Sequence, residues 1–454
     1  MKSSKEKDVK TMKGIVISSN CSGGGKTTIT LGIMKALMKL GFNVQGYKVG
    51  PDYIDPAFHS TITKKPSRNL DLFLMGEDGV KAAFSRGNGD VAVVEGVMGL
   101  LDGKGMDSRF STAHVAKTLE LPIILILSPK AASTTLAAEI QGILNYCDEW
   151  VRKPNVKGVI LNNISSGYYN LLKPIIETHC NIKVYGYVPK DEEMSLKSRH
   201  LGLIQCSEVE DIDYKINKCS EYILSNVNMD ELIDDFDETK KYEDNFHIEN
   251  KNLKIAIAKD EAFSFYYREN LELFEEVGEV VYFSPLHDEK LPDNVDFLYL
   301  GGGYPEVFIE KLSNNTSMIK SIKSGLDNGL KCYAECGGLM YLTESITTLD
   351  GKEFSTVGFF KGKSVMTTRL QNFGYCTVNI DEKSPLLKTL SINAHEFHKS
   401  KVELEENHIY NLTKNSYDGS IKNWNCGYVK KNTLAAYGHI HFFGNINFLK
   451  GLLK

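Results

Sequence analysis

Residues Lys331–Leu342 read KCYAECGGLMYL, and this stretch predicts a strand, a tight turn and the start of a helix. An extended run ends at Cys336, and two glycines and the start of a helix follow it. A thiol on such a turn lies close to backbone N–H groups, which suits an oxyanion hole, and a helix N-terminus lowers its pKa. The pattern therefore indicates a nucleophile. A buried structural cysteine is the alternative, and it is the commonest role of a free thiol.

Two further segments support a catalytic thiol. Leu298–Gly303 is an apolar run that ends in three glycines, so N–H groups near Gly303 and Gly337 are candidates for holding an oxyanion. Far downstream, the segment AYGHIHFF at Ala436–Phe443 contains His439 and His441. A Cys/His pair that is assembled only by folding shows this kind of separation. We expect one of the two histidines to act as the base for the thiol.

The composition limits the classes of function. The chain has 454 residues and a net charge of −5, which argues against a basic surface for nucleic acid. Nine cysteines occur without a CxxC pair, and this favours a reducing compartment over disulfides or a zinc site. The N-terminal residues lack the pattern of a signal peptide, and no apolar run approaches the ~20 residues of a membrane span. These features predict a soluble, cytoplasmic protein of two or three domains, with no membrane partner.

The sequence near the N-terminus predicts a phosphate-binding loop. A β-rich run at Gly14–Ser18 leads into SNCSGGGKTT at Ser19–Thr28, and Ile29–Leu40 has helical apolar spacing. In such loops backbone N–H groups hold phosphate oxygens, the lysine reaches the terminal phosphates, and the first threonine faces Mg²⁺. Asn20 replaces the first glycine of the usual pattern, and a flexible turn is the alternative. We expect ATP at Gly23, Gly24, Gly25, Lys26, Thr27 and Thr28.

Carboxylates follow two predicted strands. The strand Phe42–Val49 is followed by Asp52 and Asp55, and the strand Val91–Val94 by Glu95. Open α/β sheets bind ligands at the carboxyl ends of their strands. Carboxylates above a phosphate loop are what Mg²⁺ and a phosphoryl group require, although a segment rich in Asp and Pro is ordinarily a turn.

The remaining pattern predicts an α/β protein of two doubly wound domains with mainly parallel sheets. All-apolar strands at 122–127 and 156–161 indicate a sheet that is covered on both faces. From 208 to 251 the charge rises and strand signals vanish, which predicts a helical, charged linker. Strand patterns return at 253–258. We therefore expect a P-loop domain at 13–207, the linker at 208–251 and a second domain at 252–454.

These segments resemble the cobyrinic acid a,c-diamide synthase family. In that family a P-loop synthetase domain similar to dethiobiotin synthetase precedes a class I, triad-type glutamine amidotransferase domain. AECGGLMYL and the AYxHxHF pattern resemble its nucleophile and base motifs, and GPDYIDP, RNLD, EGVMGLLDG, RHLGL and HEFH resemble its other segments. The likeness covers roughly Lys13–Asn445. Phe373 and Lys399 depart from the leucine and tyrosine that are usual in the family, which bears on the identity of the macrocycle.

The resemblance implies a role for each candidate residue. His439 takes the base position, and since His441 stands where a glutamate would complete the triad, a Cys/His dyad is expected. A contact with adenine is implied for Asn162, which by itself reads as a turn cap. The implied Mg²⁺ ligands are Thr27, Asp52 and Glu95. The implied contacts of the tetrapyrrole are Tyr53, Asp55, Asp102, His395 and His398.

The implied reaction has two halves. Cys336 would hydrolyse L-glutamine through a thioester, and ATP would phosphorylate a carboxylate of the tetrapyrrole, whose acyl phosphate ammonia then intercepts. The same diamidation of Ni-sirohydrochlorin and the chemistry of cobyric acid synthase are alternatives. A partition-type ATPase switch with an inactive amidotransferase domain is an alternative of another class, but the loop lacks the early lysine of that class. The expected partners are small molecules, and a homodimer is compatible with the sequence.

Overall fold

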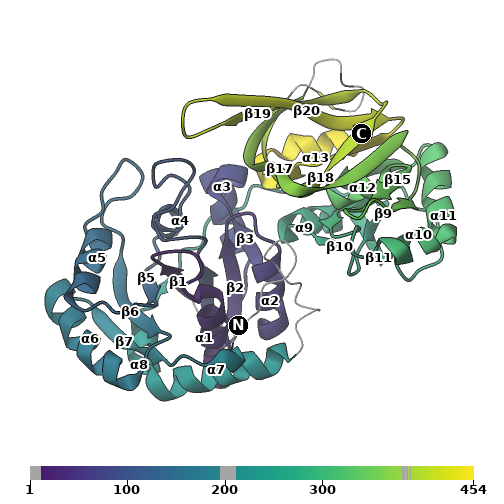
Figure 1. Ribbon diagram of the computed structural model, residues 1–454. Helices are drawn as coiled ribbons and strands as arrows, with labels where there is room; N and C mark the ends of the chain where they lie inside the picture. The colour runs from purple at the N-terminus through teal and green to yellow at the C-terminus, as the bar shows by residue number, and fades with distance from the viewer. Residues whose placement is uncertain (1–11, 195–210, 381–383, 385–386, 389) are drawn as a thin grey trace, which may run out of the picture. The chain divides into compact units, whose positions relative to one another are not determined.

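The computed structural model describes residues 12–194, 211–380, 384, 387–388 and 390–454. RHLGL lies outside them. Two compact units divide the chain (Figure 1). The first contains the described residues up to Leu72 together with Val80–Asp244, and the second contains Phe73–Gly79 and Asn245–Lys454. The prediction of two α/β domains is confirmed.

The sheet of the first unit is parallel along its main path. Among the described residues its strands follow the order β3-β2-β4-β1-β5-β6-β7, and β8 pairs with β1 in the antiparallel direction. The strands near the centre are almost wholly buried because their residues are mostly β-branched or leucine, as expected for a sheet covered on both faces. The strands are β1 Lys13–Ser19, β2 Val44–Val49, β3 Arg68–Leu70, β4 Val91–Glu95, β5 Ile123–Leu127, β6 Val156–Asn162, β7 Lys183–Val188 and β8 Asp237–Glu238.

Helices alternate with these strands along the chain (Figure 1). One of them, α3, is kinked at Gly76, whose φ of 69° is in the left-handed region that favours glycine. The helices of this part of the chain are α1 Lys26–Lys39, α2 Ile54–Thr63, α3 Leu72–Ser85, α4 Thr112–Leu119, α5 Thr134–Leu144, α6 Ser166–Cys180, α7 Ile212–Asn226 and α8 Met229–Asp234.

The described part of the expected linker at 208–251 belongs largely to the first unit, which corrects that prediction. Helix α7 packs against α1 and β7, and it buries an apolar stripe that includes Ile216 and Ile223. Gly32 of α1 allows the close approach, since a Cβ at this position would lie 2.5 Å from the Cys219 sulfur. The sequence did not reveal this stripe because the segment as a whole is highly charged. In an amphipathic helix the charged residues lie on the face opposite the apolar one.

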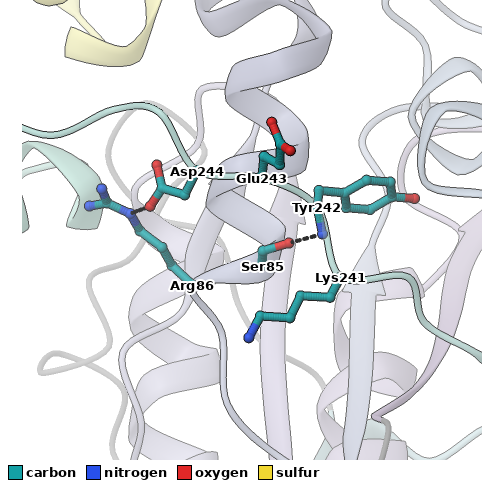
Figure 2. A pocket seen from close by; sticks show the side chains of 6 residues that line it. All are labelled: Ser85, Arg86, Lys241, Tyr242, Glu243 and Asp244. Carbon is teal, nitrogen blue, oxygen red and sulfur yellow. Dashed lines mark hydrogen bonds and ion pairs between the residues drawn. The ribbon is translucent and has the colours of Figure 1, made fainter.

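The segment after β8 is also bound to the first unit, by a hydrogen bond and an ion pair (Figure 2). The backbone N–H of Tyr242 donates to Ser85 Oγ at 2.9 Å, and Arg86 Nε lies 2.6 Å from Asp244 Oδ2. These residues line a surface pocket together with Lys241 and Glu243. The first unit therefore extends along the chain as far as Asp244.

The sheet of the second unit is mixed. The strands β11-β9-β12-β14-β21 are parallel neighbours, and the sheet continues beyond β21 through antiparallel strands that the sequence did not predict. In this unit β10 and β13 pair with each other in a separate two-stranded sheet. The strands of the unit are β9 Leu253–Ala258, β10 Phe263–Phe265, β11 Gly278–Phe283, β12 Phe297–Leu300, β13 Gly302–Gly303, β14 Lys331–Glu335, β15 Ser345–Thr347, β16 Glu353–Ser355, β17 Gly362–Ile380, β18 Ser391–Leu404, β19 His408–Asn415, β20 Ile421–Lys430, β21 Thr433–Ala436 and β22 His439–Ile440.

The helices of the second unit are α9 Arg268–Val277, α10 Ile309–Asn314, α11 Thr316–Asp327, α12 Gly337–Leu342 and α13 Ile446–Leu452. The parallel strands carry the predicted nucleophile, because β14 ends directly before Cys336 and α12 begins directly after it. In the part of the chain that the structure describes, no helix has the length and apolar character needed to cross a membrane.

Candidate active site

The phosphate loop joins β1 to α1, as the sequence predicted. Gly23 and Gly25 have φ values of 78° and 83°, which favour glycine, and Lys26, Thr27 and Thr28 form the first turn of α1. Gly24 O accepts hydrogen bonds from Ser128 Oγ at 2.8 Å and from Asn162 Nδ2 at 3.0 Å. Asn162 thus supports the loop, which is a different contact from the one with adenine that the resemblance implies.

Lys26 reaches from this loop to the segment after β4. Its side chain is buried, and Nζ donates to Met98 O at 2.9 Å. Burial and the neighbouring Lys48 lower the pKa of the Lys26 ammonium. A lysine in this place can hold a phosphate oxygen once a nucleotide enters the loop.

Glu95, at the end of β4, is the centre of a buried polar network. Its Oε1 accepts hydrogen bonds from Thr27 Oγ1 at 2.6 Å and from Lys48 Nζ at 3.1 Å. Its Oε2 lies 2.7 Å from His59 Nε2. Although burial favours the neutral acid, these cationic and hydrogen-bonded neighbours hold the pKa of Glu95 well below its usual range. Glu95 therefore lies beside Thr27, as the metal-site prediction requires.

Asp52 and Asp55 differ from their predicted arrangement. Asp52 Oδ1 accepts the N–H groups of Ile54 and Asp55 at 2.8 and 3.3 Å, so this carboxylate caps the start of α2. Asp55, which the resemblance places at the tetrapyrrole, has Oδ2 2.6 Å from Lys48 Nζ and 3.4 Å from Thr27 Oγ1. In this structure Asp55, and not Asp52, is the aspartate that contacts Thr27. The reason is that the two residues are separated by most of a helical turn and one of them is needed as the cap.

The oxygen atoms at this place suit Mg²⁺. Thr27 Oγ1, Glu95 and Asp55 offer hard oxygen ligands next to a phosphate loop, and Mg²⁺ is commonly held by one or two carboxylates with substrate phosphates. The described residues contain no group of three or more His, Cys, Asp or Glu side chains arranged to hold a metal by themselves. The residues thus fit a metal that binds together with the nucleotide phosphates.

Two members of the network were missed from the sequence. Lys48 is a buried cation within the strand β2, and burial opposes its charge while Asp55 and Glu95 raise its pKa. His59 lies on α2 and is fully buried, with Nδ1 3.1 Å from Ser67 Oγ. A lysine inside a predicted strand is the signal that could have revealed Lys48, because such a charge is seldom buried without a partner.

The other predicted tetrapyrrole contacts are divided between the two units. Tyr53 immediately precedes α2, and the exposed Asp102 accepts the Gly99 N–H at 2.8 Å, both in the first unit. His395 and His398 lie in the second unit on opposite faces of β18, which is a strand.

Cys336 occupies a strained turn between β14 and α12. Its φ of 48° and ψ of −101° are unusual for a residue with a side chain, and its N–H donates to Ala436 O at 2.8 Å. A Cβ on Gly337 would lie 3.2 Å from the Gly303 nitrogen, so the backbones of the two predicted oxyanion residues are close together. The predicted strand, turn and helix around the thiol are present.

His439 is the histidine that the structure brings to Cys336. Burial disfavours the charged ring, but the neighbouring Cys336 and Glu335 groups raise the pKa of His439 to about 10. Its ring packs on Gly302, where a Cβ would lie 2.4 Å from Cε1. His441 lies elsewhere, with Nε2 3.3 Å from Glu269 Oε2. The carboxylate of Glu335 lies 3.5 Å from His439 Nδ1.

The two histidines of HEFH also lie near this site. His395 is the cross-strand partner of His439, and burial together with His439 and Lys414 lowers the pKa of His395 to about 3. His398 stacks on Tyr437 with ring centroids 3.7 Å apart, and its Nδ1 lies 2.8 Å from Ser400 O. His398 is thus a packed part of the second unit.

Comparisons with known proteins agree with this geometry. The CobQ/CobB/MinD/ParA nucleotide binding domain matches residues 15–204, and the CobB/CobQ-like glutamine amidotransferase domain matches residues 254–446. The chain is 65% identical to the cobyrinate a,c-diamide synthase of Clostridium tetani over 98% of this chain and 100% of the relative. The enzyme of the same name from Clostridium acetobutylicum is 60% identical, with the same coverage. A third, from Caldanaerobacter subterraneus, is 43% identical over 94% of this chain and 95% of the relative. This chain belongs to the cobyrinate a,c-diamide synthase family.

Proposed function

We propose that this protein uses L-glutamine and ATP to convert the a and c carboxylates of cobyrinate to amides, a reaction of cobalamin biosynthesis. The observation that carries the proposal is the similarity to enzymes of this name along nearly the whole chain. Each unit also contains one of the two sites that the reaction needs: the phosphate loop with Glu95, and the Cys336 turn with His439.

In the second unit, the residues around Cys336 account for release of ammonia from glutamine. His439 takes the thiol proton, the thiolate attacks the carboxamide carbon, and His439 returns the proton to the leaving ammonia. The N–H groups near Gly303 and Gly337 hold the oxyanion, and both lie in the same small region of backbone. Water then hydrolyses the thioester and regenerates the thiol.

In the first unit, the phosphate loop positions ATP for attack by a substrate carboxylate. Lys26 and the N–H groups of Gly23 to Thr28 hold the phosphates. Thr27, Glu95 and Asp55 would hold Mg²⁺ together with the nucleotide, and the metal would supply positive charge to the phosphates. The resulting acyl phosphate reacts with ammonia, whereas a free carboxylate does not.

Purified protein tests this proposal when it is given ATP, Mg²⁺ and glutamine with either cobyrinate or Ni-sirohydrochlorin. We expect two amides to form on cobyrinate, with glutamate, ADP and inorganic phosphate as the other products. Amidation of Ni-sirohydrochlorin alone would contradict the proposed substrate. Hydrolysis of ATP without amidation of either macrocycle would support the partition-type switch.

A further inference from the structure

Glu335 is a buried carboxylate that immediately precedes the nucleophile in the chain. It is the last residue of β14, and its side chain is 1% exposed. Burying an ionised carboxylate is unfavourable unless it has partners that stabilise its charge. The Glu335 carboxylate therefore needs hydrogen-bond donors or a cation close to it.

The contacts of Glu335 join it to the segment that carries His439. Oε1 accepts the N–H of Ile440, the residue after His439, at 3.1 Å and the Tyr333 hydroxyl at 2.8 Å. Oε2 accepts the Tyr299 hydroxyl at 3.0 Å and faces His439 Nδ1 at 3.5 Å. Three donors thus hold the carboxylate so that one oxygen points to the ring of the base. The Nδ1 distance is longer than an ideal hydrogen bond, as is common for catalytic groups before substrate binds.

We propose that Glu335 is the positioning residue for His439 and takes the role of the carboxylate that is absent two positions after the base. The proposal rests on the glutaminase activity proposed above. A carboxylate that accepts from Nδ1–H selects one tautomer of the imidazole, and the other ring nitrogen is then free to take the thiol proton. The same carboxylate stabilises the imidazolium that forms when Cys336 becomes a thiolate.

A second buried pair shows what a purely structural carboxylate looks like in this unit. His441 stands where the triad glutamate is expected, and it contacts Glu269, with both side chains fully buried. Tyr267 and Phe443 pack against the His441 ring. The Glu269 pair matches the Glu335 pair in burial and in residue types, so it provides the control.

The charged and titratable groups that face His439 come from several elements. Cys336 and Glu335 face it from the turn after β14 and from β14 itself, and His395 faces it from β18. Tyr299 and Tyr333 face Glu335. Apart from the Cys336 thiolate itself, Glu335 is the group whose negative charge favours the imidazolium. Its loss should therefore change the titration of the Cys336–His439 pair.

The test uses the full-length protein with Glu335→Gln, and with Glu269→Gln as the matched control. Release of glutamate from glutamine and the rate of Cys336 alkylation by iodoacetamide are measured against pH, after circular dichroism has verified folding. We expect Glu335→Gln to lower glutaminase kcat by about 100-fold or more, because the amide selects the wrong tautomer. Since the imidazolium is less stable without the carboxylate, the half-maximal pH of alkylation should rise. Glu269→Gln should leave that pH unchanged.

Glu335→Asp decides the question if the glutamine variant does not fold. It keeps the charge and withdraws the carboxylate from Nδ1, so we expect an intermediate rate and a smaller shift of the alkylation profile. A wild-type rate and profile in the folded Glu335 variants would overturn the proposal, as would equal losses in Glu269→Gln. If the wild-type protein released no glutamate at all, the proposed function itself would fail instead.

Discussion

The phosphate site of the first unit and the thiol site of the second stabilise their buried reactive groups in different ways. In the first, Lys48 lies between Glu95 and Asp55, and each charge is stabilised by an opposite one. In the second, Cys336 depends on backbone strain, close N–H groups and one histidine. Removing one member of a buried ion network leaves another charge without its partner, which is strongly unfavourable. Variants of the first site should therefore act mainly by upsetting the balance of buried charges, whereas the second site also depends on the backbone geometry of the Cys336 turn.

The two sites also differ in how far apart their parts lie in the sequence. The phosphate loop is one continuous segment between β1 and α1. The thiol site combines the β14–α12 turn, the glycines of β13 and the first residue of β22. Two sites built from such different parts of the chain should lose activity independently when one of them is altered.

The largest effect is expected for Lys26→Ala, which removes the terminal-phosphate contact. Synthesis should fall by about 1,000-fold or more with either glutamine or ammonia as nitrogen source, because no acyl phosphate forms. Assays with both sources measure this, and Lys39→Ala at the other end of α1 is the control. Ammonia-dependent synthesis near the wild-type rate would contradict the assigned phosphate site.

Cys336→Ser should abolish the activity of the second unit and leave that of the first unit intact. Glutamine-dependent synthesis should be lost, while synthesis from high ammonia should persist, since the first unit does not need the thiol when nitrogen is supplied directly. Cys332→Ala, which alters another buried cysteine of β14, should retain both activities. If folded Cys336→Ser lost both, the sites would not be independent.

Glu95→Gln and Asp52→Asn sharpen the account of the metal site. Glu95 contacts Thr27, Lys48 and His59, so its amide should reduce synthesis by about 100-fold and raise the Mg²⁺ concentration for half-maximal activity. Asp52 caps α2, and an asparagine caps a helix almost as well. Asp52→Asn should therefore reduce the rate of synthesis by about tenfold or less. Mg²⁺ titration of ammonia-dependent synthesis compares the two. Equal shifts of the Mg²⁺ titration in the two variants would indicate that Asp52 is also a metal ligand. Unchanged titration curves in both variants would contradict a metal site at these carboxylates.

The smallest effect concerns Glu306, in the loop after Gly303. Burial raises the pKa of this carboxylate from its usual 4.5 to about 7, against a hydrogen bond from its own N–H. Between these values the folded state binds more protons than the unfolded state, so stability falls as the pH rises through this window. Glu306→Gln should be more stable than wild type at pH 8 and similar at pH 4. Since part of the side chain is exposed and solvent screens the effect, we expect a gain of about 1–2 kcal/mol.

Urea unfolding at the two pH values measures the difference, and Glu310→Gln, at an exposed position, is its control. A gain that did not depend on pH would show that ionisation of Glu306 is not the cause.

The sequence by itself determined the features that are local. The glycines and lysine of the phosphate loop, the apolar strands on either side and the Cys336 turn were all predicted, because each depends on neighbouring residues and their conformational preferences. The position of His439 relative to the thiol came from a family resemblance, since no local pattern states which of two histidines will face a sulfur.

Only the tertiary structure decided which charges meet. Lys48, His59 and Glu335 lie in segments that read as ordinary strand or helix, and their partners come from other elements. It also showed that Asp52 caps a helix while Asp55 contacts Thr27, and that α7 packs on the first unit. The physical reason is common to all of these. A buried charge needs an opposite charge or a donor within a few ångströms, and the chain supplies that partner from a distant position which pairing of strands and packing of helices alone bring near.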